Sequence, residues 1–448
     1  MGEIQNHGIE CTNLYLRKKL ISILIICLLF LCSCSSRDYT ITKLINKDNR
    51  VQLHQYDSPY TMLFENENST YTAYIFSSPI QYKNESGFIP FNNELIEIKK
   101  ENYVYTNKHS NTEIYFPNYI KDYILIKSNK IEIEIKYDGN FNKFNTVKKI
   151  AYINQFGTNV DAVVYKSNEL ELYFYTSNLG LELEVKYISV YKPLSFEIKS
   201  NINMLINNFH KYSYLEDEYK NSKFIIYPLF EKNNKNDNKV EVKQLNDFLY
   251  NVNFYFTSLN KNSTYSTSFN FVNENSPDSE INSCFSCKNS YLDKYSIIEK
   301  NNDTNNMLFC RLRLNYFFTC YSEDIISAYF NTYCMNYNKK KINIKLNRIK
   351  EQWSSTNLNK NNIPTLGEKV SFKTTGNFKL NFDITNFVKK CFADKSRCLE
   401  SYGFALNSMN KDYYIVSTSD NYMYIPYIEI NLKNKPIYFD YHDSINPD

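Results

Sequence analysis

Strict alternation of apolar and polar residues marks several short segments in the first two thirds of the chain. Residues 131–137 read Ile-Glu-Ile-Glu-Ile-Lys-Tyr, and residues 170–174, 181–187 and 252–256 alternate in the same way. Because successive side chains of a β-strand point to opposite faces, this alternation predicts strands with one buried and one solvated face. The Asp-Gly pair at 138–139 is a hairpin-type turn signal. With no long amphipathic helix and no repeat of about 20–50 residues, the pattern predicts an all-β, antiparallel fold.

The length of the chain predicts more than one folded unit. A chain of 448 residues exceeds a single compact core, and two or three domains of roughly 100–200 residues are expected. The content of 41 Tyr and 31 Phe suits half-buried pleated surfaces, which again favours β-structure. We expect an N-terminal β-rich domain over residues 51–275, a second domain over 282–434 and a C-terminal tail over 435–448.

The charge balance argues against a nucleic-acid partner. Lys and Arg exceed Asp and Glu by 52 − 48 = 4, whereas a nucleic-acid-binding surface gathers basic residues on one face. The basic runs at 339–341 and 389–390 are short. Lysines of this kind guard the edges of sheets.

The first 33 residues contain the parts of a secretory signal peptide with an extended N-terminus. A basic segment at 17–19 precedes an apolar run at 20–31, and small residues follow. The apolar run is about a dozen residues long, and a membrane-spanning helix needs about 20. The sixteen residues ahead of the basic segment fit a start codon assigned too early. Residues 34–50 are polar and charged, so we interpret them as a tether.

The end of this leader carries a candidate lipidation site. Leu31, Cys32, Ser33 and Cys34 resemble a bacterial lipobox. The resemblance implies that Cys34 becomes the acylated first residue of the mature protein and that its acyl chains hold the protein at a membrane. The protein would then sit on the extracellular face of the cell envelope. The alternative is cleavage without lipid, which gives a freely secreted protein.

The eleven cysteines divide between the leader and the second half of the chain, where seven lie after residue 280. Export makes disulfides feasible, but seven cysteines cannot all pair within one chain. Cys391 and Cys398 are the candidate local disulfide. Cys284 and Cys287 have the spacing of one half of a metal site, but no matching second pair or nearby histidine accompanies them. We therefore predict no metal and no cofactor, and buried thiols that pack as small apolar residues remain an alternative.

A series of signatures between residues 308 and 432 resembles the DNRLRE domain, a β-sandwich module of secreted bacterial proteins that is grouped with carbohydrate-binding modules. The matching positions are Arg311, Trp353, Pro364, Phe382, Asp383, Thr385, Tyr402, Gly403 and Pro426. The chain departs from the family pattern at Arg313, Lys360 and Cys391, where the family has an acid and two tryptophans. The resemblance implies the fold, and it carries over no ligand-binding residue.

The first half of the chain also has a family resemblance. Residues 78–95, 103–117 and 159–165 look like a segment found upstream of DNRLRE domains in large wall-associated bacterial proteins. Those proteins often carry tyrosine-aspartate repeats and a terminal toxin, and this sequence contains neither.

Structural roles are the favoured interpretation of the signature residues. We expect Trp353 to close a core rather than to stack on a sugar, and Thr385 to cap a short helix. Gly403 is expected to permit a turn or bulge, and Pro426 to begin the last strand. A cluster of tyrosines could form a platform for glycans, but the two faces of consecutive strands, half core and half surface, are the favoured explanation. Its members are Tyr413, Tyr414, Tyr422, Tyr424 and Tyr427.

No nucleophile elbow, zinc-protease motif or phosphate-binding glycine loop occurs. The sequence therefore predicts two antiparallel, jelly-roll-like β-sandwich domains after a signal peptide. It favours a non-catalytic surface or secreted protein. The family resemblance makes polysaccharide the expected partner, bound through the DNRLRE-like module at residues that the sequence does not identify. One alternative is a structural or delivery scaffold related to wall-associated toxins, and another is a secreted hydrolase whose site lies in the first domain.

Overall fold

A computed structural model gives the arrangement of the chain. The residues that it describes are 49–100, 102–128, 130–139, 144–145, 147–155, 159–188, 194–208, 213–218, 222–231, 238–256, 263–273, 283–286, 295–300, 305–311, 318–336, 341–353, 362–375, 378–393, 402–418 and 424–438. The leader, Cys34 and most of the tether lie outside them. Among the described residues, none of the helices is long and apolar enough to cross a membrane.

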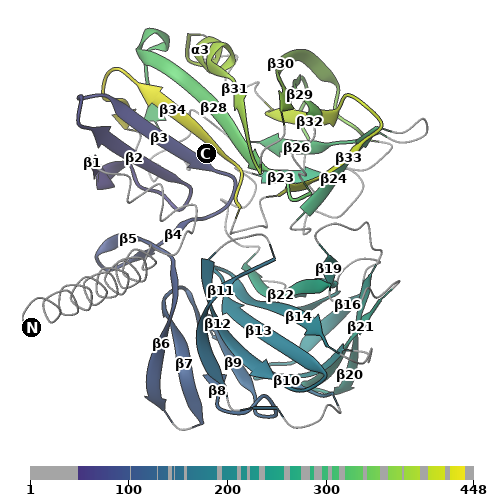
Figure 1. The fold of residues 1–448 in the computed structure, drawn as a ribbon. Helices are drawn as coiled ribbons and strands as arrows, with labels where there is room; N and C mark the ends of the chain where they lie inside the picture. Colours follow the sequence, from purple (N-terminus) through teal and green to yellow (C-terminus); the bar gives the residue numbers. More distant parts are fainter. Residues whose placement is uncertain are drawn as a thin grey trace, which may run out of the picture.

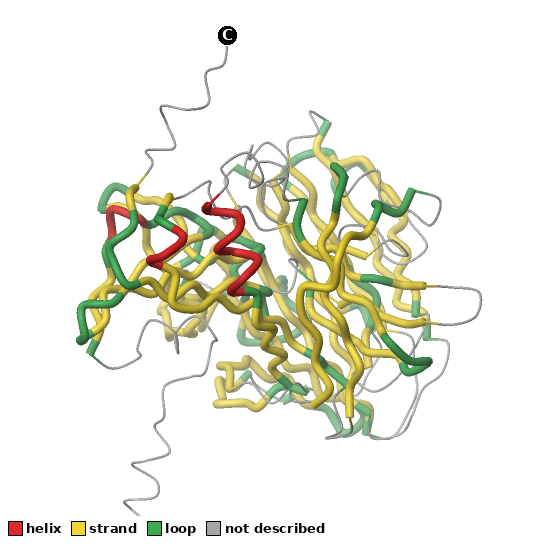
Figure 2. Tube along the Cα trace, turned by 90° about the horizontal axis from the view of Figure 1, so that it is seen from above, coloured by secondary structure: helices red, strands yellow, loops and turns green. Residues whose placement is uncertain are grey.

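The fold is all-β and antiparallel, as the alternation predicted. Strands make up most of the described chain, and helix is limited to a few turns (Figure 2). The helical segments are η1 His54–Tyr56, η4 Ser322–Asp324 and α3 Thr385–Ala393. The sheets form two bodies, which we call the first and second sandwich and which lie at the bottom and top of Figure 1.

The first sandwich contains an eight-stranded and a nine-stranded sheet. The eight-stranded sheet has the order β20 Lys239–Asn246, β21 Leu249–Tyr255, β15 Leu194–Ser200, β10 Ile131–Tyr137, β9 Ile124–Ser128, β8 Thr112–Pro117, β7 Tyr103–His109 and β6 Asn92–Lys100. The nine-stranded sheet has the order β11 Lys148–Ile153, β12 Asn159–Lys166, β13 Leu170–Thr176, β14 Gly180–Tyr187, β22 Thr264–Asn273, β18 Ser222–Ile226, β17 Ser213–Asp217 and β16 Met204–Asn208, with β19 Phe230–Glu231 beside β22.

The second sandwich is built from a six-, a five- and a three-stranded sheet. The six-stranded order is β1 Arg50–Gln52, β2 Thr61–Asn66, β3 Tyr71–Phe76, β34 Tyr427–Leu432, β28 Ile325–Tyr333 and β31 Lys379–Asp383. The five-stranded order is β23 Ser283–Ser286, β26 Leu308–Arg311, β32 Phe404–Ser408, β29 Lys341–Ile349 and β30 Leu366–Thr375. The three-stranded order is β25 Asn305–Asn306, β24 Tyr295–Lys300 and β33 Tyr413–Ser417. Two separate pairs are β4 Gln81–Asn84 with β5 Gly87–Pro90, and β27 Phe318–Thr319 with β35 Ile437–Tyr438.

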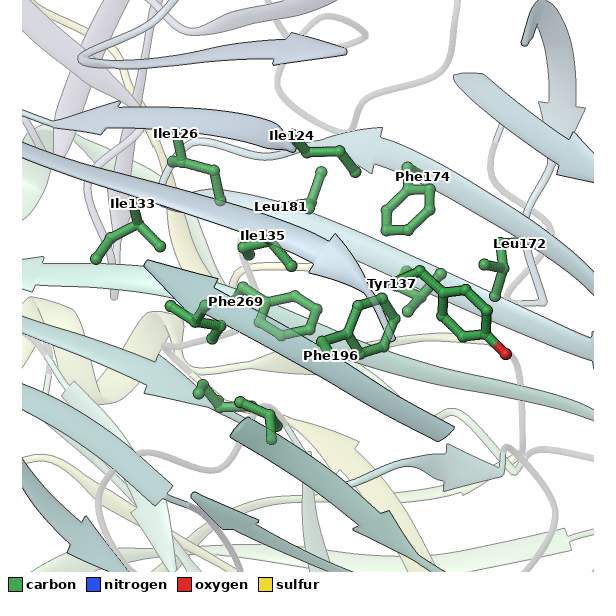
Figure 3. Packing of buried hydrophobic residues seen from close by; sticks show 14 of the residues in the cluster. Ile124, Ile126, Ile133, Ile135, Tyr137, Leu172, Phe174, Leu181, Phe196 and Phe269 are labelled. Carbon is green, nitrogen blue, oxygen red and sulfur yellow. The ribbon is translucent and has the colours of Figure 1, made fainter. Parts of the chain in front are cut away.

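The core of the first sandwich follows from the alternation in the sequence. The apolar positions of β10, Ile131, Ile133 and Ile135, are buried, and the Glu and Lys positions between them are not. They meet Phe174 and Leu181 from the opposite sheet (Figure 3). Each buried side chain of this size contributes about 1.5–3 kcal/mol relative to an exposed one, so the two facing apolar surfaces hold the sheets together.

The Asp-Gly pair at 138–139 does not close a hairpin. Strand β10 pairs with β9 and β15, whereas the next strand, β11, belongs to the opposite sheet. The backbone N–H of Asp138 instead donates to the carbonyl of Ser195 at 3.0 Å. The chain crosses between the two sheets at this point, so the turn signal marks a crossover.

The six-stranded sheet joins the two ends of the described chain. Strand β3 pairs with β34, with Ile75 opposite Ile428, and the purple and yellow strands lie side by side in Figure 1. Strand pairing therefore groups residues 50–76 with residues 325–432. The predicted limits of 51–275 and 282–434 do not follow this grouping, because alternation along a strand does not encode which distant strand becomes its neighbour.

An apolar cluster also connects the two sandwiches. It contains Val160 and Tyr175 of the nine-stranded sheet together with Phe76, Ile80 and Tyr424 from the second sandwich. All five are buried. The two sandwiches thus share buried surface.

Candidate functional site

Trp353 closes the core of the second sandwich. It is buried, its ring centroid lies 5.8 Å from that of Phe309, and its Nε1 donates to the carbonyl of Tyr402 at 2.8 Å. The Arg311 guanidinium lies 4.9 Å from the ring centroid and also donates to the carbonyl of Trp353. These contacts leave the indole no free face for a sugar ring.

Gly403 and Pro426 both precede strands. Gly403 has a φ of +92° just before β32, and a Cβ there would lie 1.9 Å from the carbonyl oxygen of Cys310. Only glycine fits this backbone comfortably. Pro426 precedes β34, and its carbonyl accepts from the N–H of Ser77 at 2.9 Å. Pro364 is buried after the segment 354–361, which lies outside the described residues.

The capping role expected of Thr385 belongs to another side chain. Helix α3 begins at Thr385, whose N–H and hydroxyl both donate to the Asp383 carboxylate, at 2.9 and 2.7 Å. The Thr385 hydroxyl accepts from the N–H of Ala328 at 2.9 Å, which ties the helix to β28. The Asp383 carboxylate, two residues before Thr385, therefore takes the capping role that the sequence predicts for Thr385. Phe382, next to it, is fully buried.

The C-terminal tyrosines do not form a platform. Tyr414, Tyr424 and Tyr427 are buried, and Tyr413 is half-buried. Tyr427 accepts a hydrogen bond from Lys379 at 2.7 Å within the sheet. Tyr422 lies outside the described residues. The described members of this group therefore serve the core of the second sandwich.

The cysteine predictions fall partly outside the described residues. Cys391 is buried on helix α3, but Cys398 and Cys287 are not described. The predicted pairing of Cys391 with Cys398 stays a prediction. Within the described part of the chain, no group of three or more His, Cys, Asp or Glu residues could hold a metal ion.

The solvated face of the eight-stranded sheet gathers aromatic and charged side chains. Tyr115 on β8 and Tyr103 on β7 lie with ring centroids 5.7 Å apart, and both are half-buried. The Lys100 ammonium lies 4.2 Å from the Tyr115 ring. Burial, together with the hydrogen bond to Glu113 at 2.8 Å, raises the pKa of Tyr115 to about 12. The phenol is therefore neutral and can donate.

A third tyrosine extends this surface across the sheet. Tyr123, just before β9, donates to the Glu197 carboxylate on β15. The Lys199 and Lys136 ammonium groups lie 3.9 and 4.9 Å from its ring centroid. Lys136 also forms an ion pair with Glu197 at 2.9 Å, and this hydrogen bond raises the pKa of Lys136. We name the surface formed by Tyr103, Tyr115 and Tyr123 the tyrosine face.

Charged residues of both signs surround the tyrosine face. Lys127 pairs with Glu132 on the neighbouring strands β9 and β10, and their side chains are 31% and 44% exposed. Asn251 and Asn253 continue the polar surface on β21. Because the opposite face of the same strands is the buried core, this face is turned to solvent. It offers flat rings between hydrogen-bond donors and acceptors.

A second polar region lies on the outer face of the nine-stranded sheet and is closed to solvent. Glu184 on β14 is 0% exposed and accepts from Tyr152 at 2.8 Å, Tyr175 at 3.3 Å and the N–H of Gln155 at 2.8 Å. Burial raises the pKa of Glu184 to about 7, although these hydrogen bonds and Lys186 act to lower it. Its carboxyl is therefore partly protonated at neutral pH.

Aromatic rings stack beside this carboxyl. Tyr152 lies on Tyr173 with centroids 4.3 Å apart and planes 18° apart, and the Lys186 ammonium lies 4.8 and 4.5 Å from the two centroids. Burial, followed by the charges of Tyr333 and Glu184, raises the pKa of Tyr424, which belongs to the second sandwich. The region thus lies where the two sandwiches meet.

The tyrosine face was missed by reasoning from the sequence. The same strands that predicted the core also supply this face, at the alternate positions that were assigned only to solvent. Tyr115 could have indicated this face, because it is an aromatic residue between Ile114 and Phe116 at a position where alternation predicts exposure to solvent. No pattern along the chain, however, indicates that Tyr103 and Tyr123 would join it.

The fold and this surface define the chain as an all-β, sandwich-like protein with an aromatic and charged sheet face. Neither a family model nor a curated protein matches it. Among solved structures, a Paenibacillus xanthan lyase is similar at 9% identity with a TM-score of 0.14, covering 89% of this chain and 40% of that chain. This chain therefore covers less than half of that protein. At such a TM-score the similarity carries no argument about fold or function.

Proposed function

We propose that this is a non-catalytic protein that binds polysaccharide at the cell envelope, and that it binds through the tyrosine face. One observation carries the proposal: Tyr103, Tyr115 and Tyr123 gather on a solvated sheet face with ammonium and carboxylate groups between them. The family resemblance points to the second sandwich as the binding module. There, Trp353 and Tyr414 are buried, so the binding surface is assigned to the first sandwich.

The chemistry of this face suits sugars. The apolar face of a pyranose ring packs on an aromatic ring, and the phenolic hydroxyl adds a polar handle. Sugar hydroxyls donate and accept, so carboxylates such as Glu197 and ammonium groups such as Lys136 can both bind them by charge-assisted hydrogen bonds. Four strand-to-strand steps of about 4.8 Å separate β7 from β15, so the face extends roughly 19 Å. That length suits an extended chain better than a single sugar.

The binding test compares single substitutions in the full chain. Tyr115→Ala and Tyr123→Ala should each weaken binding to a polysaccharide by about tenfold or more, because each removes a ring contact worth about 1.4 kcal/mol. Tyr321→Ala is the matched control, since Tyr321 is 65% exposed and lies beside η4 in the second sandwich. Affinity electrophoresis in gels that contain envelope polysaccharides measures the change.

Two results would contradict the proposal. Equal affinities for the Tyr115, Tyr123 and Tyr321 variants would place the site elsewhere. New reducing ends in polysaccharide incubated with the protein would favour the hydrolase alternative.

We also propose that the protein is exported and anchored by acylation of Cys34, with residues 282–434 as a DNRLRE-like module that supports the fold. The lipobox-like residues around Cys34 and the buried position of Trp353 support these two proposals. Cys34→Ala should move the protein from the detergent phase to the aqueous phase on Triton X-114 partitioning. Unchanged partitioning would mean that the protein is not lipidated at Cys34.

A further inference from the structure

Side chains of opposite charge alternate from strand to strand across the tyrosine face. Lys136 on β10 lies opposite Glu197 on β15, and the two form an ion pair at 2.9 Å. One row further along the strands, Lys127 on β9 lies between Glu113 on β8 and Glu132 on β10 in the register, and it forms an ion pair with Glu132. Both ammonium groups therefore have a carboxylate on a neighbouring strand, one spacing of about 4.8 Å away.

A third lysine of the face is offset in the same way. Lys199 on β15 lies opposite Glu134 on β10. It also acts on Glu197: burial tends to raise the pKa of that carboxyl, but hydrogen bonds from Tyr123 and Lys136 lower it. The ammonium charge of Lys199 lowers the pKa of Glu197 further. The charges of this part of the face are thus balanced over short distances.

We propose that the tyrosine face selects neutral polysaccharides over acidic ones. The selectivity rests on the function proposed above and adds the class of glycan to it. Salt screens charges over about 8 Å at physiological ionic strength, and the alternation brings opposite charges closer together than that. The face therefore presents little net potential with which to attract a polyanion. An acidic chain lying across the strands would meet a carboxylate beside each of these ammonium groups, and the repulsion offsets the attraction.

The hydrogen-bonding capacity of the face favours the same class of ligand. A sugar hydroxyl both donates and accepts, so it can bind to either member of a pair such as Lys136 and Glu197. The carboxylate of an acidic sugar only accepts, so it can use the ammonium groups and leaves the carboxylates of the face without a donor. Asn251 and Asn253 continue the surface on β21 with neutral amides. A chain of neutral sugars can therefore use more of the face than an acidic chain can.

Binding of the full chain to matched polymers tests the selectivity. Hydroxyethyl cellulose and carboxymethyl cellulose share a backbone and differ in charge, and so do methyl-esterified and de-esterified polygalacturonate. Biolayer interferometry on the immobilised polymers should show the neutral member of at least one pair bound about tenfold or more tightly than its acidic counterpart. The affinity for that neutral polymer should change by less than about twofold between low and physiological salt, because no net charge is neutralised on binding.

Removing two carboxylates should reverse the selectivity. Glu134→Gln combined with Glu197→Gln leaves the ammonium groups of Lys136 and Lys199 without their carboxylate partners. This variant should bind the acidic polymers about tenfold more tightly than the wild-type protein at low salt, and the gain should disappear as salt is added.

The matched control for this variant changes the net charge equally, but in the second sandwich. It combines Glu67→Gln with Glu323→Gln, because both residues are exposed and lie beside β2 and in η4. The control should bind all four polymers as the wild-type protein does. An equal gain in both double variants would show that total charge, and not the alternation on the tyrosine face, sets the preference.

The remaining outcomes separate the selectivity from the proposed function. Acidic polymers bound as tightly as neutral ones, with an affinity that Tyr115→Ala lowers, would overturn the selectivity and leave the binding site in place. Binding that Tyr115→Ala leaves unchanged, or no binding to any of the four polymers, would overturn both. If the double variant does not fold, the comparison of neutral and acidic polymers with the wild-type protein still decides.

Discussion

Glu184 shows what burial does to a single side chain. Its carboxyl is fully buried between Tyr152 and Tyr175, and burial outweighs the hydrogen bonds that favour its ionised form. Its pKa is about 7 in the folded protein and about 4.3 in an unfolded chain. The folded state therefore holds a proton that the unfolded state has lost between these values. Stability linked to this group is present below pH 4.3 and is lost as the pH rises through 7.

Glu184→Gln should remove that pH dependence. The amide has the shape of the protonated carboxyl, so the variant should not lose stability between pH 5 and 8. The free energy of unfolding of the wild-type protein should fall by up to about 3 kcal/mol over the same range. The Glu184 pKa differs by between two and three units between the folded and unfolded states, and each unit corresponds to about 1.4 kcal/mol. Urea unfolding at a series of pH values measures both slopes.

Glu171 on strand β13 provides the control substitution for Glu184. Burial acts to raise its pKa, but hydrogen bonds from Tyr173 and Lys166 lower it overall. The sign is therefore opposite: Glu171 stabilises the fold above its unfolded pKa and loses that contribution as the pH falls. Glu171→Gln should leave the slope between pH 5 and 8 unchanged. A slope that disappears in both variants, or in neither, would show that Glu184 is not its source.

Single elements of this fold depend on backbone geometry as well as on alternation. Strand β32 begins where Gly403 adopts a φ of +92° and lies against the carbonyl of Cys310 on β26. The Gly403 carbonyl also accepts from the N–H of Ile349 on β29 at 3.0 Å. One residue thus brings three strands of the five-stranded sheet together.

Gly403→Ala should destabilise the protein by at least about 2 kcal/mol, because it combines an unfavourable φ with a clash against backbone. Gly87 is the matched comparison: its φ is +112°, and a Cβ there would meet nothing within 4 Å. Gly87→Ala should lower the free energy of unfolding by only about 1 kcal/mol, the conformational cost of the substitution. Urea unfolding of both variants gives the difference, and equal losses would mean that the close approach to Cys310 is relieved at little cost.

The positions of the strands can largely be predicted from the sequence, but the strands with which they pair cannot. Alternation located β10 and β14 to within one residue, because a half-buried strand must alternate. Residues 342–346 alternate in the same way and lie on strand β29. Pairing of β3 with β34 depends on packing between segments at opposite ends of the chain, and no local pattern records it. The tyrosine face escaped prediction for the same reason, because Tyr115 and Tyr123 come from different elements.

At the scale of the whole molecule, the first strands of the chain complete the second sandwich. Ile75 of β3 is fully buried and belongs to the same core as Phe330 and Leu346. On the other side of the sheet, Phe76 packs into the cluster shared with Val160 and Tyr175 of the first sandwich. Strand β3 therefore stabilises both bodies.

Ile75→Ala should destabilise the second sandwich by about 2–5 kcal/mol, the usual cost of a large-to-small change in a core. Limited proteolysis should then cut within residues 325–432, far from the substitution in sequence. Val51→Ala is the control, because Val51 lies on β1 of the same sheet and is 65% exposed. Cuts confined to residues near 75 would contradict the shared sheet.

The pairing of Ile75 with Ile428 also dictates when the molecule can finish folding. About 350 residues separate the two partners, and closing so long a loop is slow compared with forming a local hairpin. During synthesis or export from the N-terminus, β3 presents an open edge until strand β34 arrives. A chain that stops before residue 427 keeps that edge unpaired. Such products should be the ones that aggregate or are degraded, so the sheet acts as a check that strand β34 has been synthesised.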